Sequence, residues 1–243
     1  MNQENTVNKD MRIMLKISGE QLGSDEYNFD ISRAIKVCEV IEALIKNNYQ
    51  IACVMGGGNI IRGQKLHKKG FTNQVIADQM GMLATVQNGL FLKEVLDQRG
   101  NVQGRLFSNI PVESLAERFT YQRAIKYMQR ERAVLIAGGV GKPGFTTDTG
   151  VVAQAFELHC SAVVKTTKVD GIYNKNPSNH KDAKRYTRLS FNEALANPEI
   201  QVMDRAAMAF AADKGIKIAI CQPDPDTVLS LLKGDTAKGT IVS

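Results

Sequence analysis

A glycine triplet, Gly56-Gly57-Gly58, follows an apolar run that ends at Met55, and Arg62 stands four positions after the last of these glycines. Residues without a Cβ let the backbone approach a ligand closely and turn successive N–H groups toward it, and an arginine adds a fixed positive charge. This combination is the chemistry of a phosphate site. It is not a Walker A motif, whose spacing occurs nowhere in the chain, and it is not a dinucleotide fingerprint, because Gly56 to Gly63 reads G-G-G-N-I-I-R-G.

Lysines stand at the tips of two other apolar runs. Lys16 lies near the end of the run at 12–17, which leads directly into Ser18-Gly19, and Lys165 ends the run at 161–165. Open α/β sheets bind ligands beyond the carboxyl ends of their strands, so both ammonium groups are placed for an anion. A structural alternative for Lys16 is that it simply snorkels to solvent.

A third glycine-rich segment, from Gly138 to Thr149, contains two adjacent threonines and Asp148. Flexible glycines followed by hydroxyls and a carboxylate at a helix start indicate a second anion or base site. The same residues, Thr146 to Asp148, are also typical of a helix N-cap, and the two roles are compatible. Tyr173 likewise has two alternative roles: it flanks a purine base, or it is part of the apolar core.

The reaction class follows from what these strand ends contain and what they lack. The sequence shows no Ser/His/Asp or Cys/His arrangement for covalent catalysis, and its three histidines are interpreted as structural or surface residues: His67, His159 and His180. Phosphoryl transfer needs positioning and charge neutralisation more than a nucleophilic side chain. The sequence therefore predicts a kinase.

Alternating apolar runs and amphipathic stretches predict an α/β fold with a mainly parallel sheet. Strands are expected near 12–17, 51–55, 102–107, 133–137, 161–165, 216–220 and 239–242. A helix is expected near 30–47, with Asp30 or Ser32 as its N-cap, and a second near 74–98. Gly81 and Gly89 each cost the second helix about 1 kcal/mol, which close packing or an approaching partner would repay. We expect one domain at 11–243 after a polar extension at 1–10.

Composition narrows the possible partners and the compartment. The 243 residues carry a formal net charge of +6, but the basic residues are scattered among acidic ones, which favours small anionic ligands over nucleic acid. No apolar run reaches the roughly 18 residues of a membrane span, and the first ten residues do not resemble a signal peptide. Four widely spaced cysteines are expected to be reduced structural thiols. A cytoplasmic protein is the resulting expectation.

The motifs resemble the amino acid kinase family, and within it the subgroup whose acceptor is UMP. The resemblance extends from Met11 to Ser243, and the element Asp78-Gln79-Met80-Gly81-Met82-Leu83-Ala84-Thr85 separates this subgroup from relatives that phosphorylate amino acids. The other matching stretches are Leu15 to Glu20, Gly56 to Asn59 with Arg62-Gly63, Phe145 to Asp148, Lys165 to Gly171, Val202 to Asp204 and Gly239 to Val242.

This resemblance implies a three-layer α/β/α sandwich, transfer of the ATP γ-phosphoryl group to UMP, Mg²⁺ held mainly through nucleotide phosphates, and a homohexamer. It implies catalytic roles for Lys16, Arg62, Asp148, Lys165 and Asp204, with the two aspartates orienting the lysines or the metal. The implied ATP site comprises Lys16, Ile17, Ser18, Gly19, Gly58, Arg62, Thr167, Tyr173 and Asn176. The implied UMP site comprises Gly57, Asp78, Val140, Gly141, Lys142, Pro143, Gly144, Phe145, Thr146 and Thr147.

Two positions depart from the family pattern. Asn176 stands where an aspartate usually precedes the proline, and Gly144 stands where a bulkier residue is common. The segment from Gly23 to Asp30 corresponds loosely to the part tied to GTP regulation in some relatives, and the resemblance implies GTP activation and UTP inhibition on that basis. Two rival functions stay open: a sister kinase acting on carbamate or an amino acid carboxylate, and a nucleotide-binding oligomer without catalysis.

Overall fold

The computed structural model describes residues 11–24, 26–61, 66, 70–177 and 179–243. Three of the sequence predictions, those for the 1–10 extension, for Arg62 and for His67, lie outside these residues. Within the described part, no helix is long and apolar enough to cross a membrane.

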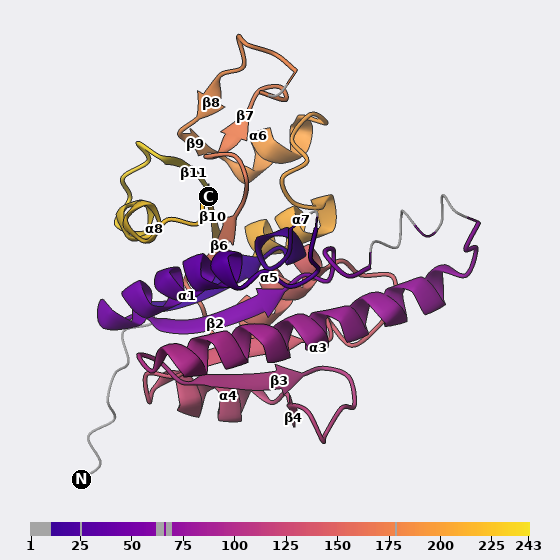
Figure 1. Cartoon of the computed structure of the whole chain (residues 1–243). Coiled ribbons are helices and arrows are strands. Elements are labelled where there is room, and N and C mark those ends of the chain that lie inside the picture. Colours follow the sequence, from indigo (N-terminus) through magenta and orange to yellow (C-terminus); the bar gives the residue numbers. More distant parts are fainter. Residues whose placement is uncertain (1–10, 25, 62–65, 67–69, 178) are drawn as a thin grey trace.

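A nine-stranded, mainly parallel sheet forms the centre of the molecule (Figure 1). Its strand order is β4-β3-β5-β2-β1-β6-β10-β11-β9, and β11 runs antiparallel to β10 while the other neighbours pair in parallel. The strands are β1 (Arg12–Ile17), β2 (Gln50–Met55), β3 (Gly104–Ser108), β4 (Glu117–Arg118), β5 (Ala133–Ala137), β6 (Ala162–Thr166), β9 (Arg188–Leu189), β10 (Lys217–Cys221) and β11 (Gly239–Val242). A separate antiparallel ribbon pairs β7 (Ile172–Tyr173) with β8 (Arg185–Tyr186).

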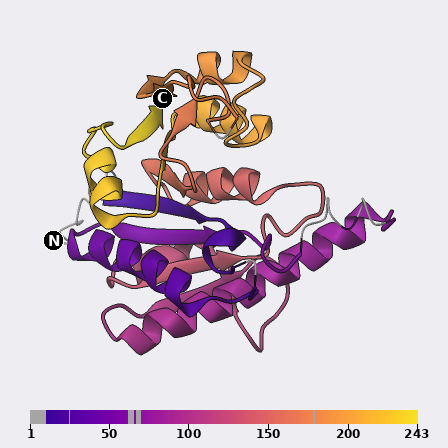
Figure 2. The ribbon, with the colours of Figure 1, turned by 45° about the horizontal axis from the view of Figure 1, so that its top comes forward.

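Helices cover both faces of the sheet, as Figure 2 shows for α1 and α3 on one side and α5 on the other. The first layer consists of α1 (Ile31–Lys46), α3 (Gln74–Arg99) and α8 (Pro225–Leu232). The second consists of α4 (Tyr121–Met128), α5 (Thr147–Glu157) and α7 (Arg205–Lys214), with α6 (Phe191–Ala196) packed on α7. A short 3₁₀ turn, η2 (Gly19–Gln21), follows β1. The predicted three-layer α/β/α fold is confirmed.

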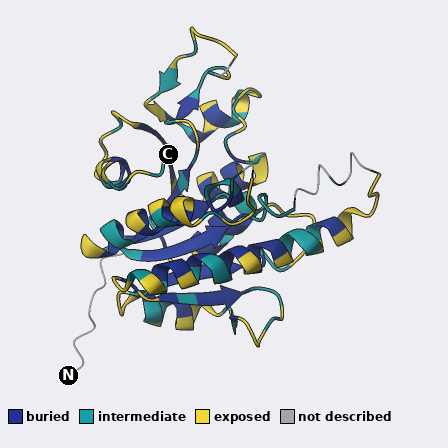
Figure 3. Cartoon of the chain, in the orientation of Figure 1, coloured by how far each residue is buried: buried dark blue, intermediate teal, exposed yellow. Residues whose placement is uncertain are grey.

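Two apolar cores, one on each side of the sheet, stabilise this arrangement. Every residue of β1 is buried, as expected for a central strand covered by helices on both faces. The central strands that Figure 3 shows are mainly buried. All four cysteines are free and buried, and burial raises the pKa of the Cys38 thiol to about 12. They are therefore packed thiols, as the sequence predicted.

The seven strands expected from the sequence are all present, with ends shifted by at most two residues. Helix α1 begins after Asp30, whose side chain accepts a hydrogen bond from the Arg33 backbone N–H, so Asp30 rather than Ser32 is the cap. The sequence did not predict β4, β7, β8 or β9. Each of these has two residues, too few to show a periodicity.

The structure explains only one of the two glycines inside α3 by close packing. A Cβ on Gly89 would lie 2.5 Å from Leu106 Cδ1 and 3.1 Å from Met55 Cε, so this glycine allows α3 to pack closely on the sheet. A Cβ on Gly81 would meet nothing within 4 Å. Packing therefore explains Gly89, whereas Gly81 faces open space.

Candidate active site

The carboxyl ends of the parallel strands meet at one edge of the sheet. Lys16 of β1 and Lys165 of β6 are direct register partners on adjacent strands, which the sequence alone did not reveal. In the sheet, β1 has the next strand of the chain, β2, on one side and the much later strand β6 on the other. The strand order therefore reverses at β1, and open α/β sheets bind their ligands at such a reversal.

Asp148 joins the two lysines into one cluster. Its carboxylate lies 3.2 Å from Lys16 Nζ through Oδ1 and 2.8 Å from Lys165 Nζ through Oδ2. The three side chains are only 10%, 15% and 11% exposed in the order Lys16, Asp148, Lys165. Lys165 also donates a hydrogen bond to the backbone carbonyl of Val202. Two cations and one anion are thus fixed at the sheet edge with net positive charge.

Burial and charge act against each other in this cluster. Burial by itself would raise the pKa of Asp148, but attraction to Lys16 and Lys165 and their hydrogen bonds outweigh it, so the pKa of Asp148 is lowered. Burial, followed by repulsion from Lys16, lowers the pKa of Lys165, with Asp148 opposing both effects. Asp148 is therefore ionised and holds the lysines in place.

Asp204 has a different position from Asp148. It is the N-cap of α7, accepting from the Ala207 backbone N–H at 2.7 Å, and its carboxylate also accepts from the hydroxyls of Thr146 and Thr149. Thr146 in turn caps α5. The capping interpretation of Thr146 is thus confirmed, and Asp204 ties the N-termini of two helices together beside the lysine cluster rather than bonding a lysine directly.

One pocket lies between α3 and the loop that follows β5; we call it the α3 pocket. Seven of its residues were predicted as nucleotide contacts: Gly57, Gly58, Asp78, Val140, Lys142, Phe145 and Thr147. Six others also line it: Ile61, Ala77, Gly81, Met82, Thr85 and Gly139. Asp78 Oδ2 accepts from the Gly144 backbone N–H at 2.8 Å and so joins the helix to the loop.

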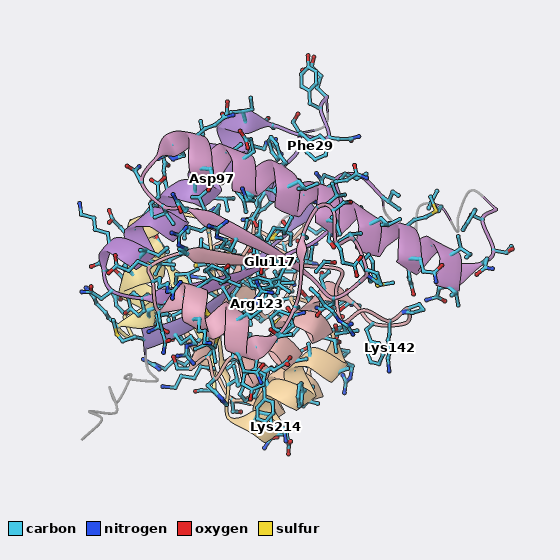
Figure 4. All side chains as sticks on the ribbon, turned by 90° about the horizontal axis from the view of Figure 1, so that it is seen from below. Phe29, Asp97, Glu117, Arg123, Lys142 and Lys214 are labelled. Atoms are coloured by element: carbon cyan, nitrogen blue, oxygen red, sulfur yellow. The ribbon has the colours of Figure 1, made fainter. Side chains whose placement is uncertain are left out.

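Four of the predicted UMP residues do not line the α3 pocket: Gly141, Pro143, Gly144 and Thr146. Phe145 is 57% exposed above it, and Lys142 lies at the edge of the molecule (Figure 4). Gly144 has a φ of +88°, a backbone conformation that glycine adopts without strain. This conformation explains why glycine stands at a position where the family pattern has a bulkier residue.

The glycine turn after β5 is held from three elements. Thr85 Oγ1 accepts from the Gly138 backbone N–H at 2.7 Å, and the Gly139 carbonyl accepts from both Asn109 and Gln154 at 2.6 and 2.9 Å. Sequence reasoning did not assign Thr85 a role, although it closes the subgroup element that begins at Asp78. Asn109 and Gln154 carried no signal in the sequence.

A second pocket lies beside the β7–β8 ribbon; we call it the β7 pocket. Thr167, Tyr173 and Asn176, three of the residues predicted for ATP, all line it. The Tyr173 hydroxyl donates to Asp170 at 2.7 Å, and hydrogen bonding to Asp170 raises the pKa of Tyr173. Val202, whose carbonyl accepts from Lys165, lines the same pocket. The lysine cluster therefore adjoins it.

The turns after β1 and β2 pack backbone against backbone. The Gly56 N–H donates to the Ile17 carbonyl at 2.8 Å, and a Cβ on Gly19 would lie 2.7 Å from the Gly58 nitrogen. Gly19 is thus required for this close approach. Ile17 has its side chain in the core, and the Ser18 N–H donates to Gln21 Oε1 at 2.9 Å.

The fold and this sheet edge define an α/β phosphotransferase, with buried lysines and glycine turns between two pockets. Residues 11–222 match the model of the family described as the amino acid kinase family. The chain belongs to the amino acid kinase family.

Curated relatives and solved structures agree with this assignment. Uridylate kinase of Aliarcobacter butzleri (strain RM4018) is 39% identical over 95% of this chain and 98% of its own length, and that of Actinobacillus pleuropneumoniae serotype 5b (strain L20) is 39% identical over 96% and 97%. The crystal structure of UMP kinase from Bacillus anthracis superposes with a TM-score of 0.89 at 30% identity, covering 96% of each chain. UMP kinase from Ureaplasma parvum gives 0.87 at 33%, covering 96% and 98%.

Proposed function

We propose that this chain transfers the γ-phosphoryl group of ATP to UMP, giving ADP and UDP, and thereby serves pyrimidine nucleotide synthesis. The observation that carries the proposal is the Lys16, Asp148 and Lys165 cluster, which adjoins two separate pockets at the edge of the sheet. Thr147, the neighbour of Asp148, lines the α3 pocket, and Val202, bonded to Lys165, lines the β7 pocket. Two phosphates entering from these pockets meet at the lysines.

The α3 pocket takes UMP in this proposal. Asp78 provides a carboxylate for the ribose hydroxyls, Gly57 provides a backbone N–H for the phosphate, and the loop from Val140 to Thr147 covers the nucleotide. Gly141, Pro143, Gly144 and Thr146 shape this loop without lining the pocket. Thr85 and Gly139 also line this pocket, and we add them to the UMP site although the sequence did not predict a nucleotide contact for either residue.

The β7 pocket takes the nucleoside end of ATP, with Thr167, Tyr173 and Asn176 around it. An amide at Asn176 replaces the carboxylate of the family pattern, so it offers the ribose one acceptor oxygen and two donor hydrogens instead of two acceptor oxygens. The triphosphate then runs toward the end of β1 and the turns after β1 and β2. The proposed contacts there are Lys16, Ile17, Ser18, Gly19 and Gly58. The family resemblance adds Arg62, which lies outside the described residues.

The chemical step needs no general base. A phosphate oxygen of UMP is already an anion; it forms a bond to the γ-phosphorus while the bond from that phosphorus to the β,γ-bridging oxygen breaks, and the electron pair leaves on ADP. Lys16 and Lys165 neutralise the charge that develops on the transferred group, and Asp148 fixes both ammonium groups beforehand. Asp204 acts as a positioning residue through Thr146 and Thr149.

Mg²⁺ fits this site through the nucleotide phosphates rather than through a cage of protein ligands. The Asp148 carboxylate already contacts two lysines and the Asp204 carboxylate already accepts from two threonines and a backbone N–H. Mg²⁺ retains several waters and commonly binds substrate phosphates, which suits that arrangement. When bound, it would neutralise part of the charge of the nucleotide phosphates.

The wider properties of the family extend the proposal. We infer a single domain at 11–243 after a polar extension, a homohexamer, a cytoplasmic location, and GTP and UTP as activator and inhibitor. These properties rest on the family resemblance, and the single domain is also supported by relatives that this chain covers over 98% and 97% of their length.

An ADP-release assay with Mg-ATP tests the proposed function. UMP, CMP, dTMP, aspartate and acetylglutamate are offered in parallel to the purified protein. UMP alone is expected to give a strong signal. A comparable signal with aspartate or acetylglutamate would identify a sister amino acid kinase instead, and ATP binding without turnover of any acceptor would identify a non-catalytic nucleotide-binding protein.

A further inference from the structure

Two asparagines form a reciprocal amide pair behind the glycine triplet. Asn88 Nδ2 donates to Asn59 Oδ1 at 2.7 Å, and Asn59 Nδ2 donates to Asn88 Oδ1 at 2.9 Å. Asn88 lies on α3 and is fully buried. A buried amide must satisfy its hydrogen-bonding groups within the protein, so this side chain has a single orientation.

The second hydrogen of each amide determines that orientation. Asn88 Nδ2 also donates to the Gly56 carbonyl at 2.6 Å, and Asn59 Nδ2 donates to the Asn28 carbonyl at 2.6 Å. Rotating either amide by half a turn would place its oxygen against a carbonyl oxygen. The two side chains and the two carbonyls are therefore locked together.

This lock acts on the peptide group between two flanking hydrogen-bonded groups: the Gly56 N–H donates to the Ile17 carbonyl at 2.8 Å, and the Gly57 carbonyl accepts from the Ile60 and Ile61 N–H groups at 3.1 and 3.0 Å. Glycine adopts many backbone conformations, and the Gly56–Gly57 peptide joins two of them. In a trans peptide the C=O of one residue and the N–H of the next point in opposite directions, and the described chain contains no cis peptide bond. A carbonyl of Gly56 held by Asn88 thus turns the Gly57 N–H away from Asn88. Gly57 lines the α3 pocket, whereas Asn88 does not.

The helix register supports the same conclusion. Asp78, Gly81 and Thr85 all line the α3 pocket, and Asn88 follows them at the spacing that keeps residues on one face of a helix. Thr85 accepts from the turn after β5 and Asn88 donates to the turn after β2. One face of α3 therefore contacts the pocket and orients both glycine turns.

We propose that Asn88 is a positioning residue for UMP, because its buried amide fixes the Gly56–Gly57 peptide with the Gly57 N–H directed at the acceptor phosphate. This inference rests on the proposed function. It assigns a task in substrate binding to a residue that has no access to the substrate.

The test compares three variants by calorimetric binding of UMP and of ATP, with thermal unfolding as the measure of folding. Asn88→Leu removes the donor while keeping a similar size, and Asn88→Asp keeps the shape but places an oxygen opposite the Gly56 carbonyl. Gln87→Glu, an exposed amide-to-acid change on the same helix, is the matched control. We expect the Kd for UMP to rise by at least about tenfold in both Asn88 variants, with the Kd for ATP within about twofold, because a buried carbonyl loses its donor.

A pH series separates positioning from a general loss of structure. In the Asn88→Asp variant the introduced carboxyl group donates a hydrogen bond again once it is protonated, and burial raises the pKa of a carboxyl group. The UMP affinity of Asn88→Asp, measured as a ratio to the wild type, is therefore expected to recover as the pH falls from about 8 to about 6, and Asn88→Leu to show no recovery.

Two results would overturn the inference alone: a folded Asn88→Asp variant that binds UMP as the wild type does, or equal weakening of UMP and ATP in step with lost thermal stability. A wild-type chain that phosphorylates no UMP would instead contradict the proposed function, and this role for Asn88 with it.

Discussion

At the scale of single residues, the site depends on one carboxylate that holds two cations. Lys16 and Lys165 occupy matched positions on neighbouring strands, and Asp148 contacts both. Without the carboxylate, two buried ammonium groups would repel each other across adjacent strands. With it, their charge is fixed in place before a nucleotide arrives, so little reorganisation remains for the chemical step.

Lys16→Ala is expected to lower kcat at least about 100-fold, the order observed when a group that stabilises transition-state charge is removed. Steady-state ADP release with saturating ATP and UMP measures this effect. Lys36→Ala, an exposed lysine on α1, serves as the control and is expected to leave kcat unchanged. A folded Lys16→Ala protein with wild-type kcat would remove Lys16 from the catalytic machinery.

Asp148 also predicts a pH dependence of stability. Its pKa is lowered in the folded chain, so its ionised form stabilises the fold above the ordinary Asp pKa of about 3.9, and that contribution is lost as the pH falls through the lowered value. Asp148→Asn is expected to cost about 3 kcal/mol at neutral pH, because it leaves buried lysines unpaired.

Urea unfolding of both proteins between about pH 7 and about pH 3 checks this prediction. The difference in the free energy of unfolding is expected to be constant near neutral pH and to shrink at the acidic end. A difference that stays constant over the whole range would show that the pKa of Asp148 is not lowered in the folded chain.

At the scale of elements, α3 connects the two glycine turns and the α3 pocket. Asp78 bonds the Gly144 N–H, Thr85 accepts from Gly138, and Asn88 donates to Gly56. A long helix is suited to this task because its side chains are held at fixed spacing along a rigid axis. The positions of both turns therefore depend on how α3 packs against the sheet.

Asp78→Asn is expected to raise KM for UMP by about tenfold or more while leaving KM for ATP nearly unchanged, because a charged acceptor is replaced by a neutral amide in the UMP pocket only. Initial rates with each nucleotide varied in turn measure the two constants. The exposed change Asp213→Asn on α7 is the control. Equal increases in both constants would mean that Asp78 supports the structure rather than the acceptor.

The two glycines of α3 are expected to respond in opposite directions. Gly89→Val places carbon atoms where Leu106 and Met55 already lie, so we expect a loss of about 2 kcal/mol in the free energy of unfolding. Gly81→Ala meets no atoms and gains helix propensity, so a gain of up to about 1 kcal/mol is expected, together with weaker UMP binding in the narrowed pocket. Urea unfolding and UMP titration measure these effects; the same sign of stability change in both variants would contradict the packing argument.

At the scale of the whole molecule, the sequence predicted what depends on local pattern. Runs of Val and Ile predicted the long strands, and the lysines and glycines after them predicted the edge where the site lies. The side-by-side register of Lys16 and Lys165 could not be predicted, because β6 reaches β1 only after the chain has built β2, β3 and β5. The antiparallel direction of β11 likewise depends on the path of the chain after α8.

Contacts between distant segments account for the rest of what was missed. Asn109, Gln154 and Asn88 orient glycine turns far from them in the sequence, and none belongs to a recognisable motif. Asp204 was expected to orient the lysines or the metal; its carboxylate bonds the start of α7 and the threonines of α5, a partnership that the sequence did not show, while its charge also acts on Lys165. A single sequence carries no signal for such partnerships.

The central claim is that two nucleotides meet at the Lys16, Asp148 and Lys165 cluster and that the phosphoryl group passes directly between them. Incubating the protein with Mg²⁺, UMP and ATP labelled on its γ-phosphorus, and then separating the products, tests this claim most directly. The label is expected in UDP, at one equivalent per ADP formed. Label released as inorganic phosphate, label retained covalently on the chain, or unlabelled UDP would contradict it.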